Sequence, residues 1–187
     1  MTKQVKKPAA APSPLDPVSL SGQLILDKEF NADNITPLIR TIKFLNLLPK
    51  EKQPKRIMIE INSPGGAIMN LSHLLYTMET SKIPVDTMAV GLSASCGCLL
   101  LMAGKKRYAL REAQIMSHTY SAGSAGKEGE LYARVKSFKQ VSKNMINWYK
   151  KFTKRSEKYI RKHLLKPEDV WLTATEAKKH GLIDKVI

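Results

Sequence analysis

Apolar residues occur along this chain either in short continuous runs or in longer stretches where they recur every three or four positions. Short apolar runs bounded by Gly, Pro or polar residues predict buried strands, and the longer spacing predicts helices that bury one face. Strands are therefore expected at 23–26, 57–61, 85–90, 107–110 and 113–117, and helices at 34–48, 67–80 and 127–153. This alternation predicts one α/β domain with a largely parallel sheet.

Residues 91–97 form an island of small residues between an apolar strand and a second apolar run, 98–103, which predicts a buried helix. Ser95 would lie on the tight turn between them, where its hydroxyl can project into a cleft. The next amides, at Cys96 and Gly97, would lie at a helix N-terminus, which stabilises an anion. A serine nucleophile and half of an oxyanion hole are built in this way. A glycine-rich helix entry capped by serine has the same pattern.

A second turn of this kind follows the strand at 57–61, where residues 63–66 read Ser-Pro-Gly-Gly. Paired glycines let backbone amides approach a substrate closely, although a tight strand-to-helix turn uses them equally well. Ligands of parallel sheets bind beyond the carboxyl ends of the strands. Both turns are expected at such ends, so together they mark the candidate site.

A nucleophilic serine requires a proton acceptor, and His118 is the best placed of the four histidines. It ends the strand at 113–117 and precedes a loop that contains Gly and Ser. Imidazole exchanges protons near neutral pH, which suits a general base for Ser95, but an ordinary polar residue can also end a strand. Of the others, His73 lies in a predicted helix, His163 in a lysine-rich segment and His180 at a predicted helix C-cap.

The third member of such a triad is a carboxylate that orients the imidazole. Asp169 and Asp184 are the candidates, and spacing alone does not choose between them.

The charge of the chain is strongly asymmetric. Its 187 residues include 31 Lys and Arg against 16 Asp and Glu, a formal net charge of +15, which favours anionic partners of any kind. Between residues 127 and 166 there are 13 basic and three acidic residues. No zinc-finger spacing or aromatic RNA-binding signature accompanies them, so a solvated basic face is expected and nucleic acid is not the expected partner.

Cysteine usage and the N-terminal stretch bear on location. Cys96 and Cys98 are one residue apart, which excludes a disulfide framework and gives no zinc spacing, so a reduced, cytoplasmic setting is expected. Residues 1–20 are rich in Pro and Lys and predict a flexible arm before a domain at 21–187. Residues 1–17 lack an apolar run, so neither a signal peptide nor a membrane anchor is expected there. The longest nearly apolar stretch, 88–103, falls short of a bilayer span, so no membrane contact is expected.

Several short motifs follow one another along the chain: Ile61-Asn62-Ser63-Pro64-Gly65-Gly66, Gly91-x-x-Ala94-Ser95-x-Gly97, Met116-x-His118, Asp169-x-x-Leu172-Thr173-Ala174 and His180-Gly181-Leu182-Ile183-Asp184. In this order and at this spacing they resemble the proteolytic subunit of the Clp protease family, from about residue 23 to the C-terminus. The resemblance implies a ClpP/crotonase-like fold of repeated β-β-α units with a mainly parallel sheet. It also implies a long protruding handle helix at about 127–153.

The resemblance also implies a function. It suggests a serine endopeptidase that cuts peptides and unfolded proteins, with Ser95 as nucleophile, His118 as base and Asp169 as the orienting acid. The backbone amides of Gly66 and Cys96 would form the oxyanion hole. No metal, nucleotide or other cofactor is implied for the chemistry.

The resemblance also chooses between the two candidate carboxylates. It implies that Asp184 has a structural role and not a catalytic one.

The chain departs from the family pattern at three places. Cys96 stands where the family usually has methionine, and residues 119–121 replace a run that usually contains proline. The family's axial loop and first amphipathic helix have no recognisable counterpart in residues 1–20, so docking of an AAA+ unfoldase is not supported by the sequence.

The segment 127–153 suggests assembly as well. Apolar and small residues recur at alternating spacings of four and three: Leu131, Val135, Phe138, Ser142, Met145, Tyr149 and Phe152. The resemblance implies a homo-oligomer of heptameric rings, joined through this helix into a tetradecamer; a long helix packed on its own domain would show the same stripe. The opposite face is expected to hold Lys136, Lys139, Lys143 and Lys150.

Other functions share parts of this pattern. A signal-peptide-peptidase-like enzyme would pair the serine with a lysine, Lys82 or Lys105, and a phage-prohead-type processing protease is a further relative of the fold. A crotonase-like acyl-CoA enzyme uses similar backbone amides, but the chain is short for that class. An inactive basic scaffold or nucleic-acid binder that keeps the fold is the alternative outside enzymes.

Overall fold

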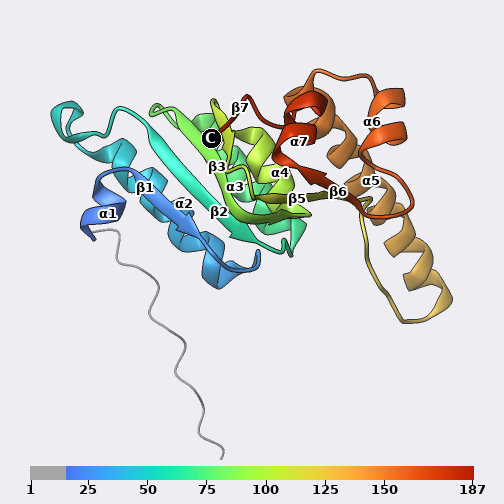
Figure 1. The fold of residues 1–187 in the computed structure, drawn as a ribbon. Coiled ribbons are helices and arrows are strands. Elements are labelled where there is room, and N and C mark those ends of the chain that lie inside the picture. The colour runs from blue at the N-terminus through green and yellow to red at the C-terminus, as the bar shows by residue number, and fades with distance from the viewer. Residues whose placement is uncertain (1–15) are drawn as a thin grey trace, which may run out of the picture.

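The computed structural model describes residues 16–187, and Figure 1 shows their arrangement. Most of the expected N-terminal arm, residues 1–15, lies outside the described residues. Residues Pro17–Leu20 form one helical turn, α1, and do not continue the arm that was expected to reach residue 20. The reason is local: the Asp16 side chain accepts a hydrogen bond from the Val18 amide at 2.8 Å and so caps the turn.

The described residues contain a sheet of seven strands: β1 (Gln23–Leu26), β2 (Ile57–Ser63), β3 (Val85–Ala94), β4 (Arg107–Ala109), β5 (Gln114–Ser117), β6 (Val170–Thr173) and β7 (Lys185–Val186). The order β1-β2-β3-β4-β7 is parallel throughout. The long strand β3 also pairs in parallel with β5 through its second half, and β6 adds to β5 in the antiparallel sense. The predicted α/β fold with a mainly parallel sheet is confirmed.

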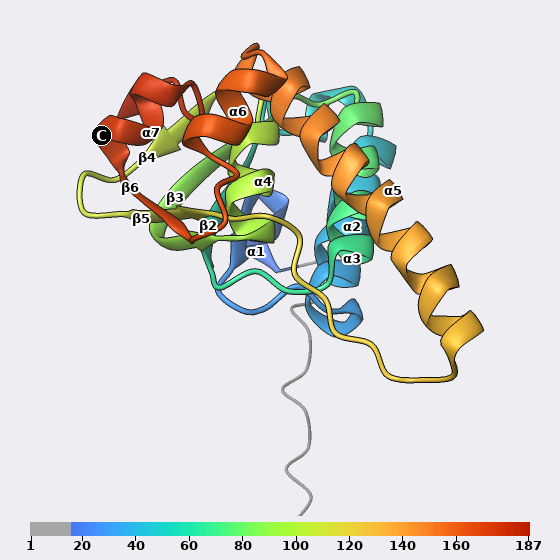
Figure 2. The ribbon, with the colours of Figure 1, turned by 90° about the vertical axis from the view of Figure 1, so that its right-hand side faces the viewer.

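The remaining helices are α2 (Ala32–Leu47), α3 (Ile68–Thr80), α4 (Cys96–Ala103), α5 (Glu128–Thr153), α6 (Glu157–His163) and α7 (Ala174–His180), with a short 3-10 turn, η1, at Lys50–Lys52. Helices α2 and α3 lie side by side against one face of the sheet (Figures 1 and 2). The α2 helix begins two residues earlier than expected because the Asn31 side chain accepts from the Asn34 amide at 2.9 Å.

Helix α4 lies at the centre of the core. Its first seven residues, Cys96 to Met102, are all buried, because the helix is enclosed by strands and by α3 and α5. A helix that is apolar all round is stable only in such a place. The end of β3 and the start of α4 are therefore held in position by the packing of the whole domain.

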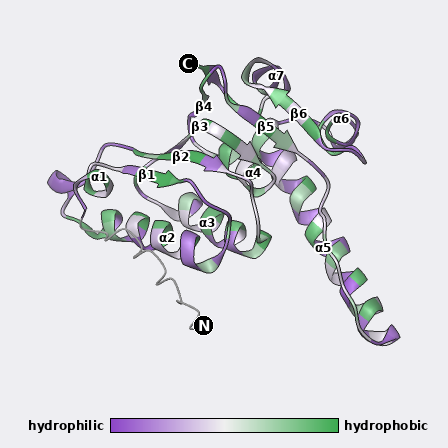
Figure 3. Cartoon of the chain, turned by 60° about the horizontal axis from the view of Figure 1, so that its bottom comes forward, coloured by the Kyte–Doolittle hydropathy of each residue, from purple (hydrophilic) through white to green (hydrophobic). Residues whose placement is uncertain are grey.

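Helix α5 behaves differently along its length. Its C-terminal half buries Met145 and Tyr149 against the core, whereas its N-terminal half projects away from the domain (Figure 2). On the projecting half Leu131 and Val135 are 36% and 48% exposed, and apolar and polar residues alternate there (Figure 3). The predicted stripe is therefore buried within the chain over only half of its length.

The expected separation of the stripe from the lysines of α5 is wrong in part. Lys139, Lys143 and Lys150 line the same groove as Val135 and Phe138, a space of about 650 Å³ beside α5. The reason is the helical period: a residue one position after a stripe residue lies about 100° round the helix, at the edge of the stripe. Within residues 16–187 none of the helices is both long and apolar enough to cross a membrane.

Candidate active site

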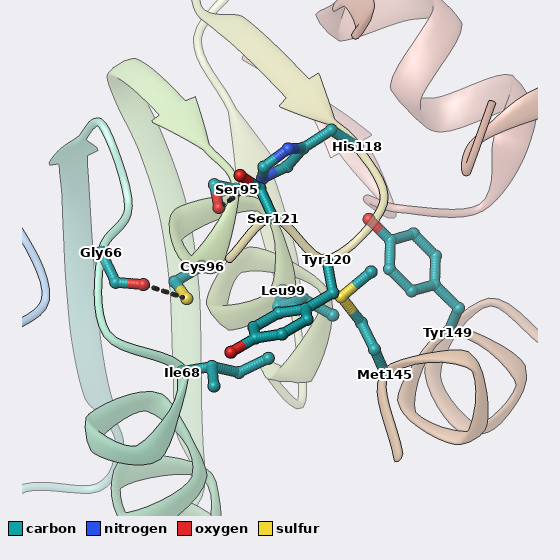
Figure 4. Close-up of a pocket in the computed structure, with 10 residues that line it drawn as sticks. All are labelled: Gly66, Ile68, Ser95, Cys96, Leu99, His118, Tyr120, Ser121, Met145 and Tyr149. Carbon is teal, nitrogen blue, oxygen red and sulfur yellow. Dashed lines mark hydrogen bonds between the residues drawn. The ribbon is translucent and has the colours of Figure 1, made fainter. Parts of the chain in front are cut away.

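Ser95 lies between β3 and α4 in an unusual backbone conformation, with φ 55° and ψ −116°. Residues with side chains rarely adopt a positive φ, and such strain persists only where the surroundings hold it. Here the Ser95 amide donates to the Met116 carbonyl at 2.9 Å, and its carbonyl accepts from the Leu99 amide in α4 at 3.2 Å. The turn directs the hydroxyl into a cavity (Figure 4).

His118 meets Ser95 because their strands are neighbours. Ala94 pairs with Met116 in the parallel β3–β5 ladder, so the residues that follow these strands leave the sheet at the same edge. The Nε2 atom of His118 is 2.7 Å from the Ser95 Oγ, a hydrogen bond of ordinary length. The structure thus brings together the two residues that the sequence named as nucleophile and base.

Asp169 lies beside the same imidazole. In the antiparallel β5–β6 ladder Ser117 pairs with Val170, which places Asp169 across from His118. The Asp169 Oδ1 is 3.8 Å from the His118 Nδ1, too far for a hydrogen bond. The Asp169 side chain is 54% exposed, against 25% for His118, so the carboxylate approaches the ring from the solvent side.

Asp184 has a different partner. Its carboxylate accepts hydrogen bonds from the Arg107 backbone amide at 2.9 Å and from the guanidinium at 3.1 and 2.5 Å. These bonds hold the pKa of the Asp184 carboxyl below its ordinary value. The pair joins β4 to the C-terminal segment, away from His118, which leaves Asp169 as the carboxylate next to the ring.

The glycine pair at 65–66 follows the end of β2, where Gly65 lies against Ser95 and Gly66 against Phe30. A Cβ on Gly65 would lie 2.6 Å from the Ser95 Cβ, and one on Gly66 would lie 2.7 Å from the Phe30 carbonyl oxygen. Both glycines also have positive φ, of 98° and 139°. Only glycine allows this approach, so the turn that was expected beside a substrate is packed directly against the candidate nucleophile.

Two residues before this turn have roles that sequence reasoning missed. The Asn62 side chain accepts from the Leu92 amide at 2.9 Å and holds the outer half of β3. The Ser63 hydroxyl donates to the Lys28 carbonyl at 2.6 Å and accepts from the Gly65 amide at 3.2 Å. Asn62 and Ser63 come directly before Pro-Gly-Gly, and polar residues in such a place are a sequence signal for a turn whose backbone is held by side chains.

The amides of Gly66 and Cys96 are free on the cavity side. Within residues 16–187 neither N–H donates to another protein group. Cys96 is the first residue of α4, where the helix dipole favours negative charge. A donor pair of this kind, next to a serine hydroxyl, can stabilise an anionic oxygen.

A small cavity of about 50 Å³ adjoins the Ser95 hydroxyl. Residues of four separate segments line it (Figure 4): Gly66, Ile68, Ser95, Cys96, Leu99, His118, Tyr120, Ser121, Met145 and Tyr149. Its apolar lining comes largely from α3, α4 and α5 and was not identified from the sequence. Helix periodicity marked those positions only as core.

Burial keeps both thiols protonated. It raises the pKa of Cys96 to about 11 and that of Cys98 to about 12. Both cysteines are free and buried. Within residues 16–187 no group of three or more His, Cys, Asp or Glu side chains is placed to hold a metal ion.

A buried polar link fixes the strand that leads to His118. The Ser117 hydroxyl is 2.6 Å from the Tyr149 hydroxyl of α5 and donates to the Leu164 carbonyl, which follows α6, also at 2.6 Å. Both bonds are buried, where an unpaired hydroxyl would be costly.

The other histidines lie elsewhere. His73 is exposed on α3. The rings of His163 and His180 pack at tilted angles against Tyr159, whose hydroxyl is 2.9 Å from the His180 Nδ1. His180 is the last residue of α7, and the C-cap is Gly181 with φ 84°, not His180 as expected, because glycine adopts the left-handed conformation without strain.

Lys82 and Lys105, the candidate bases of a Ser-Lys mechanism, are both exposed. Neither lysine lines the cavity beside Ser95.

The chain is similar to known proteins over most of its length. A family model described as Clp protease matches residues 21–187. The chain is 36% identical over 143 residues to ATP-dependent Clp protease proteolytic subunit 1 of Corynebacterium jeikeium (strain K411), which covers 75% of each protein. It is also 36% identical over 143 residues to proteolytic subunit 2 of Corynebacterium diphtheriae, covering 75% of this chain and 71% of that one.

Proposed function

Because the chain belongs to the Clp protease family and is a ClpP-like peptidase, we propose that it hydrolyses peptides and unfolded proteins through a triad of Ser95, His118 and Asp169. The single observation that supports this most strongly is the 2.7 Å hydrogen bond between the Ser95 Oγ and the His118 Nε2. It lies beside a cavity and two free amides, which is the set of groups that acyl transfer requires.

The reaction follows from these positions. Ser95 Oγ attacks the peptide carbonyl while His118 Nε2 takes its proton. The carbonyl oxygen becomes an oxyanion that the amides of Gly66 and Cys96 stabilise. His118 then delivers the proton to the leaving amine, and an acyl group stays on Ser95.

Water completes the cycle by the same route. His118 takes a proton from the attacking water, and the ester to Ser95 breaks with return of a proton to its oxygen. Asp169 holds the imidazole in the tautomer with Nδ1 protonated. Since the carboxylate oxygen is 3.8 Å from that nitrogen, a movement of about 1 Å would form the hydrogen bond.

The assembly belongs to the proposal as well. A projecting helix with exposed Leu131, Tyr132 and Val135 is a surface that a second copy could bury. We infer that α5 joins heptameric rings, up to a tetradecamer, with the active sites in an internal chamber. A cytoplasmic location is part of the same proposal, and the N-terminal stretch gives no support for a docking AAA+ unfoldase.

A fluorophosphonate probe tests the nucleophile directly. The parent protein should be labelled on Ser95 and should hydrolyse an unstructured peptide, and Ser95→Ala should lose both while it folds normally. Ser121→Ala, which removes the other serine hydroxyl of the cavity lining, is the matched control and should still be labelled. Peptide hydrolysis by Ser95→Ala at the parent rate would contradict the proposal. Salt-sensitive nucleic-acid binding without any labelling would favour the inactive scaffold instead.

A further inference from the structure

The backbone of Phe30 fixes Gly66 from one side only. The Phe30 amide donates to the Gly65 carbonyl at 2.7 Å, and the Ala67 amide donates to the Phe30 carbonyl at 2.7 Å. Together they form an isolated parallel bridge between Phe30 and Gly66. In such a bridge the central residue directs its own N–H and C=O to the other side. Both polar groups of Gly66 therefore point away from Phe30, towards α4.

On that side the Gly66 carbonyl meets a thiol. The Cys96 Sγ donates a hydrogen bond to the Gly66 carbonyl oxygen at 3.1 Å (Figure 4). The Gly66 N–H, directed to the same side, has no acceptor within residues 16–187. The Cys96 thiol thus satisfies the Gly66 carbonyl as a hydrogen-bond acceptor and leaves the Gly66 N–H free to donate.

The thiol can act as a donor throughout the neutral range. Cys96 is 3% exposed, and burial raises the pKa of its thiol to about 11. A thiol is a weak donor, but it loses this ability only when it ionises. The thiol therefore stays protonated near neutral pH and can donate to the Gly66 carbonyl there.

From this geometry we propose that Cys96 is a positioning residue of the oxyanion hole, an inference that rests on the proposed function. The side chain of one oxyanion residue binds the backbone of the other, so the thiol fixes the distance and orientation between the Gly66 and Cys96 amides. It also satisfies a carbonyl dipole that would otherwise face the developing negative charge. Both effects stabilise the transition state more than the bound substrate.

Four variants test the inference by peptide hydrolysis. Cys96→Ala and Cys96→Val remove the donor, and Val keeps more of the side-chain volume. Each should lower kcat by about 5- to 30-fold with KM changed less than about two-fold, a smaller loss than removal of an oxyanion donor itself. Cys96→Ser retains a donor and should recover to within about three-fold of the parent kcat. Cys98→Ala removes the neighbouring buried thiol, which neither lines the cavity nor bonds Gly66 within residues 16–187, and should keep the parent kcat.

A transition-state analogue gives a second readout. A peptide aldehyde forms a hemiacetal with the serine, and its oxygen occupies the oxyanion position. Its inhibition constant should weaken in Cys96→Ala by the same factor as kcat, whereas KM for the matching peptide should not change. Thermal unfolding shows whether a lower kcat only reflects a less stable fold. If Cys98→Ala is less stable but keeps the parent kcat, lost stability alone does not explain the lower kcat of Cys96→Ala.

Three results would overturn the inference. The first is parent kcat and aldehyde binding in both Cys96→Ala and Cys96→Val. The second is an equal kcat loss in Cys98→Ala, which would indicate a general packing effect. The third is a kcat in Cys96→Ser as low as that of Cys96→Ala. Failure of the proposed function is distinguishable, since the parent protein itself would then show no Ser95-dependent hydrolysis; it would overturn the inference at the same time.

Discussion

The two sides of the hydrogen bond between Ser95 and His118 are built differently. On the serine side, the backbone is fixed by the Met116 carbonyl, by the contact with Gly65 and by the fully packed helix that follows. On the histidine side, the ring lies at a strand end and is 25% exposed. Its carboxylate partner, Asp169, is 54% exposed and 3.8 Å away.

This contrast separates what the core determines from what it leaves adjustable. The serine turn needs a strained backbone, and only a rigid, buried surrounding can hold one. The imidazole and carboxylate need only rotate, and exposed side chains rotate readily. Substitutions on the serine side should therefore affect stability and chemistry together. Substitutions on the histidine side should affect chemistry alone.

Loss of the base should have the largest effect. His118→Ala should fold with parent stability and lower kcat by about 10⁴- to 10⁶-fold, because triad members act as a unit. Steady-state hydrolysis and thermal unfolding together measure this. Lys82→Ala and Lys105→Ala are the controls and should hydrolyse normally. If a lysine variant lost probe labelling while His118→Ala kept it, a Ser-Lys mechanism would replace the triad.

Asp169→Asn should come next, with kcat lower by about 10³- to 10⁴-fold and the fold unchanged. An amide in this position favours the wrong imidazole tautomer, even though the carboxylate of the parent is exposed. Glu168→Gln alters the adjacent carboxylate, which is 3.6 Å from the Lys166 Nζ, and should have little effect on kcat. Equal losses in both variants, or none in Asp169→Asn, would contradict the assignment of the orienting acid.

Gly65→Ala tests the rigid side. The new Cβ would meet the Ser95 Cβ at 2.6 Å in a backbone with φ 98°, so the turn must shift. We expect a loss of about 1–3 kcal/mol in the free energy of unfolding from the strained backbone. A kcat decrease of about 10²-fold should accompany it, since small displacements of reacting groups are costly. Gly123→Ala, where the added Cβ meets nothing within 4 Å, should alter neither quantity. Parent activity in Gly65→Ala would show that the serine side is more adjustable than the contrast implies.

Phe138→Asp should have the smallest effect, through assembly. Phe138 packs against Tyr120, a residue of the cavity lining, with ring centroids 5.8 Å apart. A charge there should yield smaller, less active particles. Ser137→Asp adds the same charge at an exposed neighbouring position and should assemble as the parent does.

Salt should favour assembly, because each chain has a formal net charge of +15 and the Debye length shrinks from roughly 30 Å at 0.01 M to roughly 8 Å at 0.15 M. Analytical ultracentrifugation across a salt series measures the particle size. A monomer at every salt concentration that still hydrolyses peptides would overturn the ring assembly and leave the triad intact.

The sequence predicted best those features that depend on local pattern. The strands and helices on both sides of Ser95 have their expected places, and the long helix expected at 127–153 occupies Glu128–Thr153. Ser95 and His118 were named because each ends an apolar strand, and the parallel β3–β5 pairing brings them to 2.7 Å. Their catalytic roles remain predictions, which the variants above test.

Features that depend on contacts between distant segments could not be predicted. The residues alone left Asp169 and Asp184 equivalent, because the choice depends on the antiparallel β5–β6 pairing and on the partner that Arg107 supplies. The bond from Cys96 to Gly66 joins residues 30 positions apart and has no local signal. The apolar lining of the cavity was hidden for the same reason, since core and pocket positions share one helical period.

The hydroxyl bonds of Ser117 have a consequence for synthesis on the ribosome. The backbone hydrogen bonds of the serine turn and the close approach of Gly65 involve residues up to Met116. The strand end before His118, in contrast, is anchored by Tyr149 and Leu164. A nascent chain leaves the ribosome N-terminus first, so the contacts of the serine turn can form before those that anchor the strand end at His118. We therefore expect the hydrolytic centre to be completed late in translation, when roughly the last fifth of the chain is being made, and the growing polypeptide to be inert until then.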